Sequence, residues 1–126
     1  MTRTDQAAPL LRVLGDVRRL RLLRILQEQK ELCVCELVDA LELPQYEVSR
    51  HLAALRKAGL VNDRREGLWA FYSIAESTLR DPFMGGFLEL IDKKLRDGKQ
   101  SANDSLRLQQ RLGIRVGGQC VVGCQD

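Results

Sequence analysis

Four cysteines are the residues of this sequence whose type and spacing could support chemistry, and they fall into two pairs. Cys33 and Cys35 flank one valine in the stretch ELCVCEL, and Cys120 and Cys124 lie close to the C-terminus. Thiolates are soft ligands that bind soft metal ions, and they also undergo reversible oxidation. We therefore predict a metal or redox role for them, with Cys33, Cys35, Cys120 and Cys124 as the candidate metal ligands.

The alternative interpretation of these cysteines is structural. Cys33 and Cys35 could be two small buried hydrophobic residues, and Cys120 and Cys124 could belong to an incidental mobile tail. Residues two apart on a regular helix point about 200° apart. The first pair would then lie on opposite faces of a helix start, which favours a ligand role over simple burial.

Composition limits the class of protein. The chain has 126 residues, 44% of them hydrophobic, which fits a single domain with one modest core. A net charge of +3 permits binding to nucleic acid. Arginines interrupt the leucine-rich stretch RVLGDVRRLRLLRIL, so it cannot span a bilayer, and we see no signal peptide. We expect a cytoplasmic protein whose thiols are kept reduced.

The elements that position the cysteines are mostly helical. Leu43-Pro44 separates two short helices, and this order is the helix-turn-helix pattern. After Gly59 the period changes, and LVNDRR, the turn Glu66-Gly67 and LWAFYSI predict a β-hairpin. The predicted fold is mostly α with a β-hairpin wing, a winged helix-turn-helix. Helices are expected at 6–14, 17–28, 33–42, 44–58 and 82–96, with a short one at 104–112.

This pattern divides the chain into a folded domain and a C-terminal tail. We predict that residues 1–98 form a winged helix-turn-helix domain for DNA binding and dimerisation, and that residues 99–126 form a mobile C-terminal tail. The apolar face of the helix at 82–96 is broader than a small domain can cover, so a second subunit is expected to cover it.

The helix at 44–58 has one apolar and one polar face. Val48, Leu52 and Leu55 share a narrow sector and must face the core, whereas Tyr46, Arg50, Ala53 and Lys57 lie opposite. Arginine can donate a bidentate pair to a guanine edge or to a phosphate. A solvated face would carry the same residue types, but the basic hairpin that follows favours double-stranded DNA. The candidate contacts of this region are Tyr46, Ser49, Arg50, Lys57, Arg64 and Arg65.

His51 is a weaker candidate. It falls beside the apolar sector of its helix, so a packing histidine is the favoured interpretation over a base-reading one. It is also the only histidine, and the chain has no nucleophile–base pair and no CxxC motif. An enzyme or thiol carrier is therefore not expected.

These segments resemble the ArsR/SmtB family of metal-responsive repressors over roughly residues 9–75. The resemblance rests on DVRRLRLLRIL, ELCVCELVDAL and VSRHLAALRKAGLVNDRREGLWAFYSI in that order. It implies a winged helix homodimer that sits on operator DNA and leaves when an inducer binds. It adds Gln45 to the candidate DNA-reading residues and places His51 in the same segment.

The Cys-Val-Cys pair resembles the arsenical-responsive branch, which implies As(III) or Sb(III) as inducer and no constitutive cofactor. The best-known members have a third cysteine where this chain has Val38. Trivalent arsenic accepts three sulfurs, so Cys120 or Cys124, from the same or the partner chain, could supply the third. A tetrahedral site for cadmium, lead or zinc, and a thiol redox switch, remain the alternatives.

A regular helix cannot direct Cys33 and Cys35 at one ion. We therefore expect ligand binding to reshape the first turn of the helix at 33–42, which supports the DNA-reading helix, and so to disfavour the DNA-competent form. Such coupling is reciprocal, so DNA would weaken ligand binding by the same factor.

Overall fold

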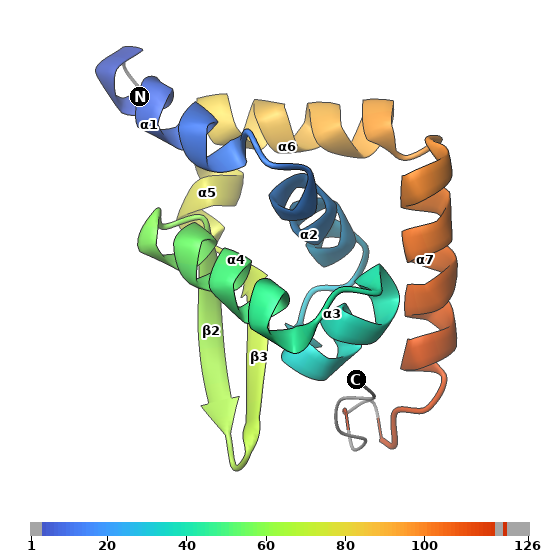
Figure 1. Ribbon diagram of the computed structural model, residues 1–126. Helices are drawn as coiled ribbons and strands as arrows, with labels where there is room; N and C mark the ends of the chain where they lie inside the picture. Colours follow the sequence, from blue (N-terminus) through green and yellow to red (C-terminus); the bar gives the residue numbers. More distant parts are fainter. Residues whose placement is uncertain (1–3, 118–119, 121–126) are drawn as a thin grey trace.

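The computed structural model describes residues 4–117 and residue 120, and it shows a helical body with a projecting hairpin (Figure 1). Seven helices and three strands occur within these residues. The strands form one antiparallel sheet in the order β1-β3-β2. In chain order the elements are α1 (Thr4–Leu14), α2 (Val17–Glu28), β1 (Leu32–Cys33), α3 (Val34–Leu41), α4 (Gln45–Lys57), β2 (Val61–Glu66), β3 (Trp69–Ile74), α5 (Glu76–Arg80), α6 (Pro82–Leu95) and α7 (Lys99–Leu112).

Helix α2 is the centre of the core. The Asp16 carboxylate accepts hydrogen bonds from the amides of Arg18 and Arg19 and caps the helix start. Leu23 and Leu26 of α2 are buried. Val17, the first residue of α2, is instead 70% exposed, since it lies at the helix end, beyond the reach of the core.

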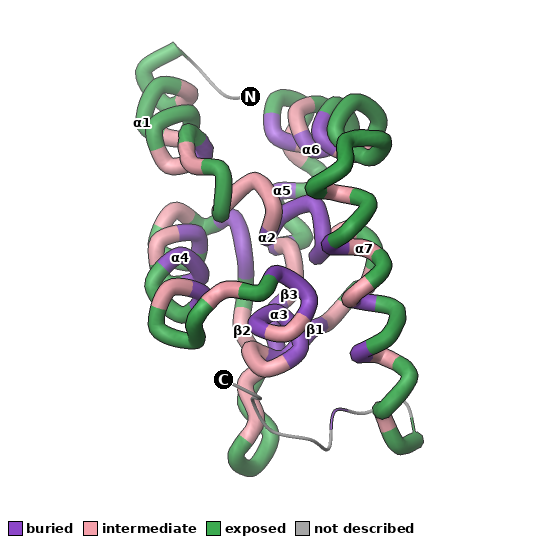
Figure 2. Tube along the Cα trace, turned by 45° about the vertical axis from the view of Figure 1, so that its right-hand side comes forward, coloured by how far each residue is buried: buried purple, intermediate pink, exposed green. Residues whose placement is uncertain are grey.

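Helices α3 and α4 form the predicted helix-turn-helix. Glu42 takes a left-handed conformation with φ of 53° after α3, and Pro44 precedes α4. Val48, Leu52 and Leu55 are fully buried, as their spacing predicted. The opposite side of α4 faces outward (Figure 2).

The predicted hairpin is present, with one strand more than expected. Strands β2 and β3 pair antiparallel around Gly67, whose φ of 59° suits glycine. The two-residue β1 adds to the other edge of β3. Neither β1 nor the short α5 was predicted from the sequence, because each has too few residues to show a hydrophobic period.

Helix α7 covers the side of α3 that faces away from α4 (Figure 1). The sequence predicted a mostly mobile tail here with a helix over 104–112. The structure has a longer helix that contacts both α2 and α3, with Leu108 fully buried. Asp104 is also buried, and its carboxylate accepts hydrogen bonds from Arg21 Nε and Nη2, each at 2.9 Å, which fixes α7 to α2. None of the helices in the described residues has the length and apolar character that a membrane crossing needs.

Candidate functional site: a buried thiol pair beside the DNA-reading elements

Cys33 lies where β1 and α3 meet. It is the last residue of β1 and the residue that precedes α3, with extended backbone angles of φ −81° and ψ 163°. Its amide donates to Glu36 Oε1 at 3.1 Å, so the first turn of α3 is closed by a carboxylate three residues on. The side chain is buried at 1% exposure. Cys33 therefore touches the wing sheet and the start of α3 together.

Cys120 is brought to the same place from the end of the chain. Its Sγ lies 2.8 Å from Cys33 Sγ, and both residues are buried. Phe71 completes this small buried cluster, and Cys35 and Trp69 pack against it. The structure thus brings one tail cysteine and the first motif cysteine into contact within a single chain.

The other two predicted ligands, Cys35 and Cys124, are not both seen as thiols at this site. Cys35 lies in the first turn of α3, is half-buried and is disulfide-bonded in this structure. It has to be reduced before it can act as a thiolate. Cys124 lies outside the described residues.

Charged residues that sequence analysis did not select surround the two thiols. Glu36 is fully buried and accepts from Arg115 Nε at 2.5 Å and Nη2 at 2.7 Å. Arg111 bonds Asp39 at 2.7 Å and brings Nη2 to 3.8 Å from Cys120 Sγ. Glu36 has a carboxylate oxygen within 4.8 Å of both sulfurs. The spacing of four between the two arginines was the signal available in the sequence.

Cys33 does not lie on a helix, contrary to the prediction from sequence. Both motif cysteines were expected on a regular helix, pointing about 200° apart. Cys33 precedes the helix and is extended, so its side-chain direction is not set by the helical wheel. A ligand can reach its sulfur with α3 intact, and unwinding of the first turn is no longer required by geometry.

The thiol of Cys33 is strongly protected from ionisation. Burial raises its pKa to about 12, and the hydrogen bond with Cys120 adds to this. The pKa of the neighbouring Arg115 is also raised, chiefly by its bond to Glu36. At neutral pH the site therefore presents Cys33 as a neutral thiol next to a closed ion pair.

The outward face of α4 carries five of the predicted DNA contacts at its surface. Tyr46 is 71% exposed, and the Arg50 side chain is 63% exposed. Both residues belong to the exposed outer side of α4, and the buried residues of the helix are Val48, His51, Leu52 and Leu55. The five exposed residues are Gln45, Tyr46, Ser49, Arg50 and Lys57.

His51 does not share this face. It is 2% exposed, and its Nδ1 accepts from Arg19 Nε at 3.1 Å. Its pKa is lowered, mainly by burial. In this structure His51 is the packing histidine that its helical phase favoured, and it does not reach the surface where a base would lie.

The two wing arginines differ from each other. Arg64 pairs with Glu31 at 2.9 Å and with Glu66 at 2.5 Å, and its guanidinium lies 4.7 Å from the centre of the Phe71 ring. Arg65 is more exposed, and its Nε comes no closer than 3.9 Å to the Asp63 carboxylate, which is a weak ion pair. Arg65 is thus freer to meet a phosphate than Arg64.

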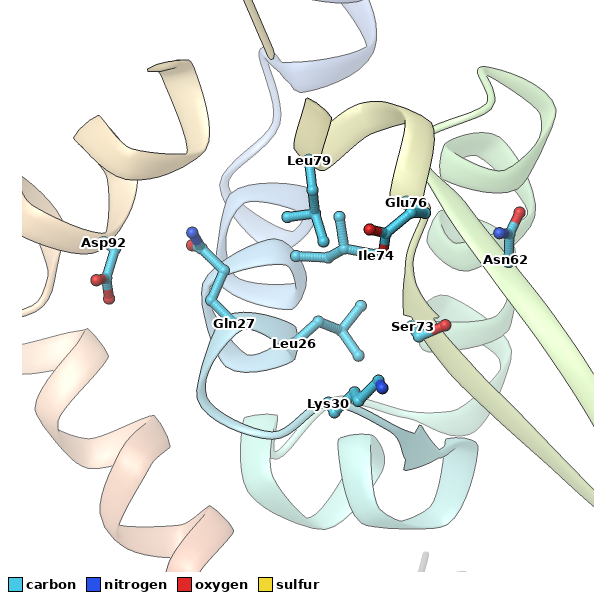
Figure 3. A pocket seen from close by; sticks show the side chains of 9 residues that line it. All are labelled: Leu26, Gln27, Lys30, Asn62, Ser73, Ile74, Glu76, Leu79 and Asp92. Atoms are coloured by element: carbon cyan, nitrogen blue, oxygen red, sulfur yellow. The ribbon is translucent and has the colours of Figure 1, made fainter. Parts of the chain in front are cut away.

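A cavity of about 570 Å³ opens elsewhere, between α2, α6 and the base of the hairpin. Leu26, Ile74 and Leu79 project into it, and Asp92 stands across from Gln27 (Figure 3). No cysteine and no exposed residue of α4 is among the described residues that line it. The thiol site is therefore a closed contact between side chains and not part of this cavity.

Known proteins resemble the chain over this same region. Residues 16–63 match the family described as "Bacterial regulatory protein, arsR family". An uncharacterized HTH-type transcriptional regulator of Methanocaldococcus jannaschii is 37% identical over 93 residues, which are 74% of this chain and 99% of that relative. The chain belongs to the ArsR family.

Further comparisons agree with this assignment. The arsenic resistance transcriptional regulator ArsR2 of Pseudomonas putida is 43% identical over 105 residues, covering 82% of this chain and 86% of that protein. Reduced HlyU from Vibrio cholerae matches in structure with a TM-score of 0.62 at 37% identity, over 71% of this chain and 88% of HlyU. This ArsR-family chain is a winged helix transcriptional regulator, which confirms the predicted family and fold. Its relatives form a non-enzymatic family, so the expectation that it is not an enzyme is also confirmed.

Proposed function

We propose that this protein is a homodimeric repressor that leaves its operator when As(III) or Sb(III) binds to Cys33, Cys35 and a tail cysteine. The observation that carries the proposal is the contact between Cys33 and Cys120 at the start of α3. Cys35 packs against the same cluster. Among the relatives, the arsenic resistance regulator ArsR2 of Pseudomonas putida supports arsenic as the ligand.

The chemistry suits a neutral arsenic species. Arsenous acid, As(OH)₃, reacts with three thiols to form three As–S bonds, and each thiol proton leaves with a hydroxide as water. The Cys33 thiol does not have to ionise before it reacts. Burial, which keeps this thiol protonated, therefore does not prevent arsenic binding. Two thiols would release two waters and leave one hydroxide on arsenic.

DNA binding is assigned to α4 and the wing. We propose that the exposed residues of α4 read the major groove and that Arg65 meets the phosphate backbone. Arsenic on Cys33 would act on β1, which pairs with β3 of the wing, and on α3, which packs against α4. A change at one sulfur would thus alter both DNA-contacting elements of a cytoplasmic, DNA-bound dimer.

The decisive experiment is a titration of the reduced, operator-bound protein with sodium arsenite, followed by fluorescence anisotropy of labelled DNA. Wild-type protein should dissociate, while Cys33→Ser and Cys35→Ser should bind DNA normally and stay bound. Ser49→Ala is the control, because Ser49 is exposed on α4: it should weaken DNA binding and leave arsenite binding unchanged. Undiminished operator binding by wild-type protein at saturating arsenite would contradict the proposal.

One observation favours a redox switch as second candidate. Cys33 and Cys120 are neighbouring thiols, and Cys35 is disulfide-bonded. Hydrogen peroxide would take two electrons from a thiol pair, giving one disulfide and two waters. Release of DNA by peroxide without arsenite would favour this function, and titration with Cd²⁺ in the same assay tests a divalent ion as inducer.

A further inference from the structure

We propose that Arg115 is a positioning residue of the thiol site, and that its ion pair with Glu36 directs Cys120 of the same subunit onto Cys33. This inference rests on the proposed function, because it concerns the source of the third thiolate. It assigns a specificity role to a basic residue just beyond α7 that neither binds DNA nor touches the inducer.

The first support is the register between the C-terminal segment and α3. Arg107 donates to the carbonyl oxygen of Ala40 at 2.8 Å, and Arg111 bonds Asp39 at 2.7 Å. Arg115 then bonds Glu36. Each successive arginine, four residues further along the chain, contacts a residue nearer the start of α3. The two segments therefore run antiparallel. The pair Cys120 and Cys33 continues this series by one step.

The second support is the position of Glu36 between the two chain segments. Its Oε1 accepts from the amide of Cys33 at 3.1 Å and from Arg115 Nη2 at 2.7 Å. One carboxylate therefore connects the backbone of Cys33, the first ligand, to Arg115, which comes five residues before Cys120. Arg115 Nη2 also donates to the carbonyl oxygen of Glu31 at 2.9 Å, which fixes the guanidinium against the strand side of the site.

The third support is burial. Glu36 is fully buried, and a buried carboxylate without its cation is strongly unfavourable. Arg115 therefore has a strong reason to stay in place, and the chain that follows it starts from a fixed point. Arg107 offers a matched comparison, because it belongs to the same series and lies eight residues before Arg115, but pairs with Asp104 and Glu42.

The test uses full-length, reduced protein with sodium arsenite as the probe. Arg115→Ala, Arg115→Lys and the control Arg107→Ala are compared with wild type by X-ray absorption, which counts sulfurs on arsenic, and by equilibrium dialysis. Wild type and Arg107→Ala should show three sulfurs. Arg115→Ala should show two sulfurs and one oxygen, with an affinity about 10–100-fold lower, and Arg115→Lys should lie between. Three sulfurs with wild-type affinity in Arg115→Ala would overturn the proposal.

A second measurement does not depend on arsenic or on the stability of one variant. Diamide oxidises two thiols to a disulfide and is itself reduced to the hydrazine, and peptide mapping then locates the product. The Cys33–Cys120 disulfide should form several-fold more slowly in Arg115→Lys than in wild type or Arg107→Ala. Equal rates would refute the positioning role. If wild type binds no arsenite yet shows this difference, the proposed function fails while the positioning role stands.

Mixed dimers test whether the thiolate comes from the same subunit. Cys33→Ser and Cys120→Ser subunits, each also carrying Cys124→Ser, are combined and loaded with arsenite. No three-sulfur site should form, because neither subunit keeps both cysteines. A three-sulfur site at half occupancy would show that Cys120 crosses to the partner, and it would overturn the inference even if Arg115→Ala did not fold.

Discussion

Cys33 of β1 lies directly opposite Phe71 of β3 in the antiparallel pair that joins the thiol site to the wing. The two side chains also share a small buried cluster with Cys120, apart from the main core. The guanidinium of Arg64 lies over the Phe71 ring, 4.7 Å from its centre. A ligand that moves the Cys33 sulfur must therefore displace, or be resisted by, a residue of the wing.

The first prediction concerns this contact. Phe71→Leu should keep arsenite binding but reduce the effect of arsenite on DNA affinity, because the smaller side chain fills less of the space between sulfur and wing. Coupling between sites is typically about 5–150-fold, and the variant should fall toward the lower end. DNA affinity with and without arsenite measures it. Ile74→Val, at the far end of β3 opposite Val61, is the control and should retain wild-type coupling.

The second prediction concerns the kind of DNA contact that Arg50 of α4 makes. Arg50→Ala should weaken operator binding by about 1–3 kcal/mol if the side chain pairs with a base, without changing arsenite affinity. If Arg50 binds a phosphate, the slope of log affinity against log salt should fall by about 1 instead. Anisotropy titrations at several salt concentrations distinguish the two. Operator affinity and a salt slope equal to those of wild type would remove Arg50 from the interface.

The third prediction concerns the pH dependence of stability through His51. Burial lowers its pKa below the ordinary value of 6.5, so the unfolded chain binds a proton more readily than the folded one. The free energy of unfolding should therefore fall as pH drops below about 6.5. His51→Gln should flatten this dependence in urea titrations between pH 5 and 7 (about the range where histidine titrates). An unchanged slope would point to other groups.

Long periodic segments and their caps were predictable from sequence, and short or tertiary features were not. Asp16 and the stripe of α4 give local signals, so those helices were found. Strand β1 has two residues and exists because it pairs with β3, which no local pattern encodes. Missing it put Cys33 on a helix and led to the wrong premise about side-chain direction.

The charged half of the candidate site was hidden for a different reason. Glu36 and Arg115 are 79 residues apart in sequence, and each alone resembles an ordinary surface residue. Only the docking of α7 on α3 brings them together. The cysteines were recognisable by type, but their environment depends on that docking.

The fourth prediction tests the docking of α7. Leu108 is fully buried, so Leu108→Ala should lower the free energy of unfolding by about 2–5 kcal/mol, the usual cost of a core leucine. Leu106→Ala, on the same helix but 60% exposed, is the control and should change it by less than about 0.5 kcal/mol. Urea unfolding of both variants is the measurement. Equal small effects would mean that α7 contributes little to the folded domain.

The fifth prediction uses the pKa of Cys33 to separate inducers. Because burial raises this pKa to about 12, the thiol stays protonated from pH 6 to 8. Arsenous acid binds with no net release of protons, since each one leaves in water, so its affinity should be nearly constant over this range. A divalent ion such as Cd²⁺ must expel the Cys33 proton, and its affinity should rise by at least about tenfold per pH unit.

Equilibrium dialysis at pH 6, 7 and 8 measures both affinities on the same reduced protein. Cys33→Ser should lose arsenite affinity and should also lose the part of the Cd²⁺ slope that its proton causes. A steep rise of arsenite affinity with pH in wild type would show that a thiolate has to form first. In that case the neutral, buried thiol would not be the group that discriminates between arsenous acid and divalent ions.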